Sequence, residues 1–150
     1  MTTILALDLG TQTGWAIYKD GQIVSGSQSF KTKSVDGAGM RYLRYLSWLD
    51  SIKKEHEIID EVYFEEVRRH KGTQAAHVYG AFKGVLMMWC EEWMIPYQSV
   101  PVGTIKLFAT GKGNANKEMM IDAARKGGYD VVDDNQADAI HLLRYAIDAE

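Results

Sequence analysis

Residues 5–18 read LALDLGTQTGWAIY, and this stretch of sequence indicates the fold. The apolar run Thr2–Asp8 is rich in strand-forming residues, so we expect a strand that is buried on both faces. Gly10 and Gly14 are expected to bracket a turn after it. A carboxylate at the end of such a strand is difficult to place on a protein surface. Asp8 is therefore a candidate functional residue.

The remainder of the chain predicts two more strands close to the first, followed by strand–helix units. The expected strands are Trp15–Tyr18, Gln22–Ser29, Glu61–Val67 and Pro96–Val100, with Asp20-Gly21 as a hairpin signal. The expected helices are Met40–Glu55, Thr73–Trp93, Lys117–Lys126 and Asp133–Ala149, with a helical turn at Gly103–Ala109. This order of elements indicates a mixed α/β sheet packed by helices, in one domain spanning residues 1–150.

Composition excludes several classes of protein. The chain has 150 residues, 46% of them hydrophobic and 25% charged, which is typical of a globular domain. One cysteine, Cys90, rules out an internal disulfide framework, and its apolar surroundings favour a buried, unreactive thiol. The N-terminal residues have no signal-peptide pattern, and we find no apolar stretch of membrane-spanning length. We therefore expect a soluble, cytoplasmic protein with no membrane partner.

The long helix expected at Thr73–Trp93 has two apolar stripes. The first stripe consists of Ala76, Tyr79, Phe82, Leu86, Trp89 and Trp93. The second consists of Val78, Val85, Met87 and Met88. A helix that is apolar on two sides must bury both, and little chain is left to cover the second. This pattern suggests a partner subunit.

Acidic side chains fall where strands end and where the last helix begins. They are Asp8, Glu65, Glu66, Asp133, Asp134 and Asp138. Functional groups on α/β sheets gather at such positions, and these carboxylates can converge if the first and fourth strands are neighbours. Strand alternation allows only one of Glu65 and Glu66 to point at the site. Converging carboxylates repel one another unless cations hold them, and two Mg²⁺ ions about 4 Å apart are suited to phosphodiester cleavage.

Positive charge is concentrated in residues 68–117, which contain seven Lys or Arg residues and two acidic residues. The net charge of −3 conceals this segregation. The candidate DNA-binding residues are Arg68, Arg69, Lys71, Lys112 and Lys117. The Gly- and Asn-rich loop before Lys117 can present backbone N–H groups to a phosphate, and a lysine there can stabilise developing charge.

Taken together, these motifs resemble the RuvC family of Holliday-junction resolvases, in the ribonuclease H-like superfamily. The matches are LALDLGTQTGWAIY, YFEEV at residues 63–67, the Gly-spaced segment 79–84, the basic loop Gly111–Lys117 and DNQADAIHLL at residues 134–143. The second match selects Glu65 over Glu66. In the terminal motif Asn135 stands where the family has an aspartate, so the fourth ligand is either Asn135 or Asp134. The aromatic wedge found in many family members is replaced by Arg68-Arg69-His70-Lys71.

The resemblance implies a ribonuclease H-like five-stranded sheet, with three antiparallel strands and two parallel ones, flanked by helices. It implies catalysis by Asp8, Glu65, Asp138 and Lys117, with two Mg²⁺ ions, replaceable by Mn²⁺, bound to the three carboxylates and to Asp134 or Asn135. It also implies a homodimer that cuts branched DNA by paired phosphodiester hydrolysis, on four-way junctions and, as further candidates, three-way junctions and forks. The short length is more like that of phage resolvases.

Two other functions remain open. The segment LDLGTQTG also resembles the first phosphate loop of actin-type and sugar-kinase-type ATP-dependent phosphotransferases, which share the core fold but normally need two lobes. Asn135, which weakens one ligand position, leaves room for a junction-binding module without chemistry.

Overall fold

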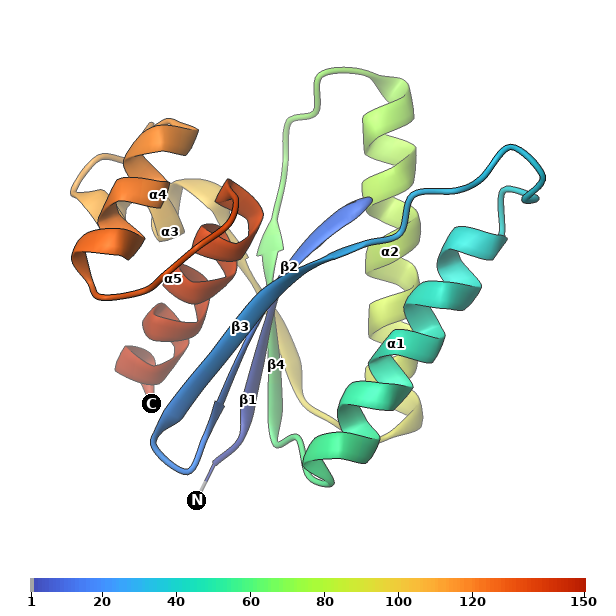
Figure 1. Cartoon of the computed structure of the whole chain (residues 1–150), viewed down its shortest axis with the longest axis horizontal. Coiled ribbons are helices and arrows are strands. Elements are labelled where there is room, and N and C mark those ends of the chain that lie inside the picture. Colours follow the sequence, from blue (N-terminus) through green and yellow to red (C-terminus); the bar gives the residue numbers. More distant parts are fainter. Residues whose placement is uncertain (1) are drawn as a thin grey trace.

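The computed structural model describes residues 2–150, arranged as one five-stranded sheet between two layers of helices (Figure 1). The strands are β1 (Ile4–Asp8), β2 (Gln12–Lys19), β3 (Gln22–Ser29), β4 (Glu61–Glu66) and β5 (Tyr97–Pro101). The helices are α1 (Met40–His56), α2 (Thr73–Glu92), α3 (Val102–Thr110), α4 (Lys117–Lys126) and α5 (Asp134–Ala149).

The sheet confirms the expected mixed topology. Its strand order is β3-β2-β1-β4-β5. The pairs β1–β2 and β2–β3 are antiparallel, and β1–β4 and β4–β5 are parallel. The first and fourth strands are therefore neighbours, which is the condition for their terminal carboxylates to meet.

Two local expectations were wrong. The segment expected to form one helical turn is the nine-residue helix α3, which starts directly after Pro101 at the end of β5. Gly14 does not bracket a turn: it lies within β2 and pairs with Asp8 of β1. The pairing of β2 with β3 starts already at Gln12, so only the segment 9–11 is left to connect β1 and β2.

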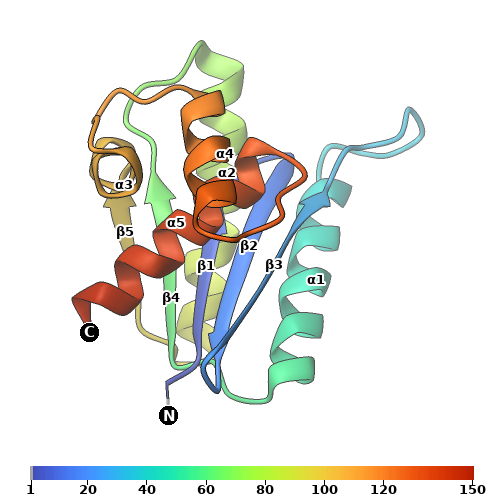
Figure 2. The same ribbon diagram turned by 60° about the vertical axis from the view of Figure 1, so that its left-hand side comes forward.

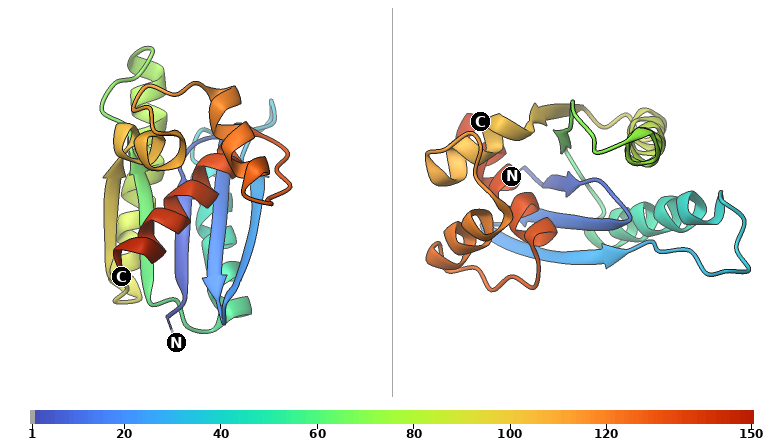
Figure 3. Two further views of the ribbon diagram at one scale, coloured as in Figure 1. Left: turned by 90° about the vertical axis from the view of Figure 1, so that its left-hand side faces the viewer. Right: turned by 90° about the horizontal axis from the view of Figure 1, so that it is seen from above.

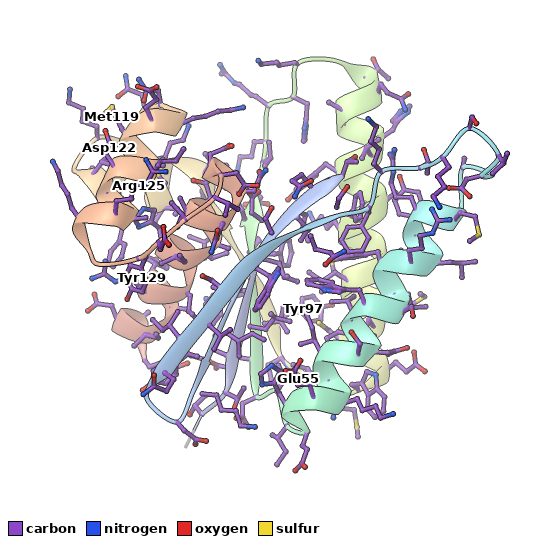
Figure 4. All side chains as sticks on the ribbon, viewed as in Figure 1. Glu55, Tyr97, Met119, Asp122, Arg125 and Tyr129 are labelled. Carbon is purple, nitrogen blue, oxygen red and sulfur yellow. The ribbon has the colours of Figure 1, made fainter. Side chains whose placement is uncertain are left out.

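Side-chain alternation along β1 divides the core in two. Leu5 and Leu7 face α1 and α2, in a core that includes Tyr45, Phe82 and Trp89. Ile4 and Ala6 face the opposite way, into a core built mainly from α5, α4 and α3. Figure 3 shows the sheet between these two helix layers, and Tyr97, labelled in Figure 4, packs against the α1–α2 core. Asp8 continues the Ile4–Ala6 series and so belongs to the α5 face.

Helix α2 buries Tyr79, Phe82, Leu86 and Trp89, as the first apolar stripe predicts. In the second stripe, Val78 and Val85 pack against the same core, and Met88 remains 56% exposed. A single chain thus covers more of this helix than expected. Within residues 2–150, no helix is both long and apolar enough to cross a membrane.

Candidate metal and nucleic-acid site

Three of the predicted carboxylates meet at one end of the sheet. Asp8 ends β1, Glu65 is the penultimate residue of β4, and Asp138 lies in the second turn of α5. Each offers a carboxylate oxygen within 4.8 Å of the others. Glu65 shares its face of β4 with Tyr63, which packs into the α5 core, so both strand carboxylates point toward α5. Glu66 points the other way and pairs with Arg68 at 3.4 Å.

Gly14 allows α5 to approach the sheet closely enough to deliver Asp138. A Cβ at position 14 would overlap the backbone carbonyl of Asn135, the second residue of α5. Any side chain there would push the start of the helix away from β2. Figure 2 shows α5 starting at the end of the sheet near the β1–β2 connection and crossing the strands from there.

A network of polar side chains ties the start of α5 to β3. Asp133 caps the helix by accepting a hydrogen bond from the Gln136 N–H at 2.8 Å, and it accepts another from Ser27 Oγ at 2.7 Å. The Gln136 side chain is 6% exposed, donates to Ser25 Oγ at 3.0 Å and accepts from the Val132 N–H at 2.8 Å. Sequence reasoning missed Gln136, because no local pattern reveals a partner 111 residues away.

Tyr79 of α2 fixes the end of β4 that carries Glu65. Its hydroxyl donates to the Glu65 carbonyl oxygen at 2.7 Å and accepts from the Val67 N–H at 3.3 Å. The backbone on both sides of Glu66 is therefore held by one buried side chain. This bond limits how far Glu65 can move when a charged group binds beside it.

The pKa values of the three carboxyl groups are raised above their usual range. Burial, followed by repulsion from Glu65 and Asp138, raises the pKa of Asp8 well above its usual range. Burial also raises the pKa of Glu65, while its hydrogen bond with Asp8 opposes the shift. Burial, followed by repulsion from Glu65 and Asp134, raises the pKa of Asp138 to about 8. Without cations, the cluster therefore retains protons at neutral pH.

The donor set fits hard divalent cations. All three side chains offer oxygen ligands, which Mg²⁺ and Mn²⁺ prefer. Within the described chain, the buried Oδ1 of Asp138 has no hydrogen-bond partner. An unpartnered buried carboxylate oxygen beside two further carboxylates is costly in an apo protein and favourable beside a cation.

Two lysines and a fourth acid surround the cluster. Lys117, the first residue of α4, lies with its Nζ 4.0 Å from Asp134 Oδ2. The positive charge of Lys106 on α3 opposes the rise in the pKa values of Glu65 and Asp138. Sequence reasoning did not include Lys106 among the candidate site residues. It lies on α3, which packs on the same face of the sheet as α5.

The two candidates for a fourth ligand, Asp134 and Asn135, have different surroundings. The negative charge of Asp134 contributes to the raised pKa values of Asp8, Glu65 and Asp138, although its carboxylate is not among the three that meet within 4.8 Å. The backbone of Asn135 lies against Gly14. Because Asp134 carries the charge that the cluster experiences, we favour it as the fourth ligand.

The remaining predicted residues lie on two loops at the same end of the sheet (Figure 2). Arg68, Arg69 and Lys71 are exposed on the loop between β4 and α2, and Lys112 is exposed on the loop between α3 and α4. Asn116 caps α4 by accepting from the Met119 N–H at 2.9 Å, which fixes the start of the helix that Lys117 opens. The two basic loops thus flank the carboxylates.

Two further buried residues have structural roles. His141 is buried and its Nε2 lies 2.9 Å from the Met120 carbonyl oxygen, so it links α5 to α4. Burial lowers its pKa. Cys90 is buried in the α1–α2 core, and burial raises the pKa of its thiol to about 12, which makes it unreactive.

The strand order, the two helix layers and the carboxylates on the α5 face together define a ribonuclease H-like fold, and among solved structures the similarity is to RuvC-type resolvases. The RuvC of T. thermophilus in complex with a Holliday junction substrate superposes with a TM-score of 0.80 at 20% identity, over 99% of this chain and 95% of that one. A Thermus thermophilus RuvC structure gives 0.74 at 19% identity, over 99% and 97%.

The yeast mitochondrial Holliday junction resolvase Ydc2 gives a TM-score of 0.62 at 13% identity, over 94% of this chain and 75% of that one. Comparison of the sequence with protein-family models gives no match, and comparison with curated proteins gives none. The structural similarity therefore establishes the fold, which confirms the expected five-stranded ribonuclease H-like sheet.

Proposed function

We propose that this chain is a metal-dependent, structure-selective endodeoxyribonuclease that resolves Holliday junctions and other branched DNA by paired phosphodiester hydrolysis. The observation that carries the proposal is the convergence of Asp8, Glu65 and Asp138 within 4.8 Å at the end of the sheet that the basic loops flank. The similarity of the fold to RuvC structures, one of them bound to a Holliday junction, supports the choice of substrate.

In this proposal the carboxylates of Asp8, Glu65 and Asp138, with Asp134 as the fourth ligand, hold two Mg²⁺ or Mn²⁺ ions. Such ions, when bound, activate a water and stabilise the leaving oxygen of a phosphodiester. The carboxylates must lose their protons to bind the ions, so the affinity for the ions decreases as the pH is lowered.

The cations of the chain hold the DNA. Arg68, Arg69, Lys71 and Lys112 contact phosphates on either side of the cluster, which positions the duplex arms without reading bases. The Lys117 amine, now paired with Asp134, is close enough to the cluster to stabilise charge on the scissile phosphate.

We further propose that each chain forms one domain and that the active form is a homodimer, because paired cuts need two sites. Exposed apolar side chains on the α1–α2 side, including Met88 and Trp93, support an interface there. The substrate also agrees with a location inside a bacterial cell, with the gene carried by the host or by a phage.

Incubation with labelled four-way, three-way, forked and linear DNA, each with Mg²⁺, Mn²⁺ or chelator, tests this function. We expect paired cuts in the four-way junction that require the metal and are absent on linear duplex. Metal-independent binding without cleavage would instead identify a junction-binding module. ATP turnover with no effect on branched DNA would identify the phosphotransferase alternative.

A further inference from the structure

The loop between β3 and α1, residues 30–39, carries positive charge that the proposed site does not use. Lys31 and Lys33 are exposed on this loop, and Arg41 follows it in the first turn of α1. Val35 in its middle is 88% exposed, so this part of the loop does not pack on the core. Figure 1 shows the loop projecting away from the sheet, beside the start of α1. We call residues 30–39 the β3–α1 loop.

The strand directions place the β3–α1 loop at the carboxylate end of the sheet. Strand β3 is antiparallel to β2, and β2 is antiparallel to β1, so β3 runs in the same direction as β1 and β4. Its carboxyl end therefore lies at the end of the sheet where Asp8 and Glu65 meet Asp138. In the strand order, β3 forms one edge, and β5, which leads directly into α3, forms the other. The carboxylates on the central strands thus lie between the β3–α1 loop and the helix that carries Lys106.

Two hydrogen bonds fix the base of the β3–α1 loop. The Phe30 N–H donates to the Thr11 carbonyl oxygen at 2.7 Å, which joins the loop to the connection between β1 and β2. Arg41 Nε donates to the Phe30 carbonyl oxygen at 3.2 Å. The ring of Phe30 is buried in the α1–α2 core, so the loop starts from a well-packed part of the molecule.

An ion pair closes the middle of the loop. Asp36 accepts a hydrogen bond from the Lys33 N–H at 2.8 Å and two from the Arg44 guanidinium, at 2.7 Å and 3.0 Å. The hydrogen bonds from Arg44 lower the pKa of Asp36 to about 2, so this carboxylate stays charged and paired at neutral pH. A bidentate pair of this kind restricts both side chains. The backbone that carries Lys33 is therefore ordered before any ligand binds.

The pairing leaves a surplus of positive charge on the loop. Arg44 and Asp36 neutralise each other, whereas Arg41 bonds a neutral carbonyl. No ion pair of the chain from residue 2 onward involves Lys31 or Lys33. Like charges gathered at one place on an acidic chain attract a polyanion, and under the proposed function a phosphodiester must reach this same end of the sheet. A nucleic-acid backbone is therefore the partner whose charge and position fit the loop.

We propose that the β3–α1 loop binds phosphates of the junction DNA through Lys31 and Lys33, at the β3 edge of the sheet. Such contacts hold the backbone in position without reading bases. They extend the DNA-binding surface from the loops that follow β4 and α3 to the β3 edge, so that DNA is held across the whole carboxylate end. This inference rests on the proposed nuclease function.

Removing the two charges together tests the loop. Binding of the Lys31→Ala, Lys33→Ala double variant to a four-way junction is measured over a series of salt concentrations, with chelator present to prevent metal-dependent cleavage. Each phosphate contact contributes about −0.9 to the slope of log affinity against log salt, so the slope of the double variant is expected to be smaller by about two. The Lys31→Arg, Lys33→Arg double variant keeps the charges and is expected to keep the slope. Lys54→Ala, at the other end of α1, is the control for loss of a surface lysine.

A cross-link locates the contact. Cys90 is buried and is the one cysteine of the chain, so a cysteine introduced on the surface can be labelled selectively. Ser34→Cys carries a photo-cross-linking reagent on the β3–α1 loop, and Ser51→Cys carries the same reagent at an exposed position in the second half of α1. We expect the first variant to cross-link to junction DNA and the second to give background only.

Three results would overturn the inference. They are an unchanged salt slope in the double alanine variant, an equal loss of slope in the double arginine variant, and equal cross-linking from the two cysteine variants. The second result would give the lysines a structural role in place of a charged one. Failure of the wild type to cut branched DNA, with the binding and cross-linking results as expected, refutes the nuclease function alone, because neither measurement depends on cleavage.

Discussion

Gly14 of β2 lies directly against the backbone of Asn135, so close that a methyl group on residue 14 would overlap the Asn135 carbonyl. We predict that Gly14→Ala destabilises the protein by about 1–3 kcal/mol, because overpacking moves backbone. It also moves Asp138 away from β1, so divalent-ion binding and cleavage are lost together. Denaturant unfolding and Mn²⁺ titration measure both. Gly37→Ala is the control, since a Cβ there meets nothing within 4 Å. Full ion affinity in Gly14→Ala would contradict this role.

Variants of the adjacent residues Glu65 and Glu66 distinguish a role in catalysis from a general effect of negative charge. Glu65→Gln removes a proposed metal ligand and is expected to lower junction cleavage by at least about a hundredfold, while binding survives. Glu66→Gln makes the same change one residue later on the opposite face of β4, and is expected to retain cleavage. Asp8→Asn should behave as Glu65→Gln does. Wild-type cleavage rates in either of these two variants would show that the site is assigned wrongly.

The raised pKa of Asp138 makes stability depend on pH in a defined direction. Because the folded state favours the protonated form, stability is fully present below pH 3.8 and is lost as the pH rises to about 8. Asp138→Asn escapes this loss. With chelator we therefore expect the variant to exceed the wild type by about 1–3 kcal/mol at pH 8 and to match it near pH 4. Denaturant unfolding across this range measures the difference.

Stabilisation by divalent ions provides a second test of Asp138. Mg²⁺ or Mn²⁺ binds only the folded wild type and is expected to raise its melting temperature. The same ions should stabilise Asp138→Asn much less. If the two proteins respond equally to the ions, Asp138 is not a ligand.

Gln136 holds the start of α5 through groups on β3 and on the preceding loop. Gln136→Met keeps the volume but leaves the Val132 N–H and Ser25 hydroxyl without this partner, at a cost of about 1–3 kcal/mol. We also expect Mn²⁺ affinity to fall, because Asp134 and Asp138 share this helix start. Gln28→Met, at an exposed position on β3, is the control. A stability loss with unchanged Mn²⁺ affinity would limit Gln136 to a structural role.

Binding to junction DNA should depend steeply on salt despite the net charge of −3. Each phosphate contact contributes a slope of about −0.9 to log affinity against log salt. Replacing Arg68, Arg69 and Lys71 with alanine is expected to reduce the slope by about two to three. Lys54→Ala, at the exposed end of α1, is expected to leave it unchanged. Salt-independent affinity of the wild type would exclude the basic loops as the DNA-binding surface.

Local pattern determined most of the architecture and singled out the three carboxylates that converge. The apolar run that ends in Asp8 predicted a buried strand, and alternation in YFEEV together with the family resemblance selected Glu65. Strand and helix periodicity act over a few residues, so they can be read from the chain alone. The helix starts at Lys117 and Thr73 were correct for the same reason.

Other features depended on contacts between distant segments, and only the tertiary structure decided them. Gly14 resembles a turn residue in the sequence, yet its function is to admit the backbone of α5 about 120 residues later. Lys106 acts on the carboxylates because α3 packs on the same face of the sheet as α5. The sequence by itself determined which side chains can bind cations and phosphates, because that chemistry is local. The geometry that brings them together depends on how layers pack, and no short stretch of sequence encodes it.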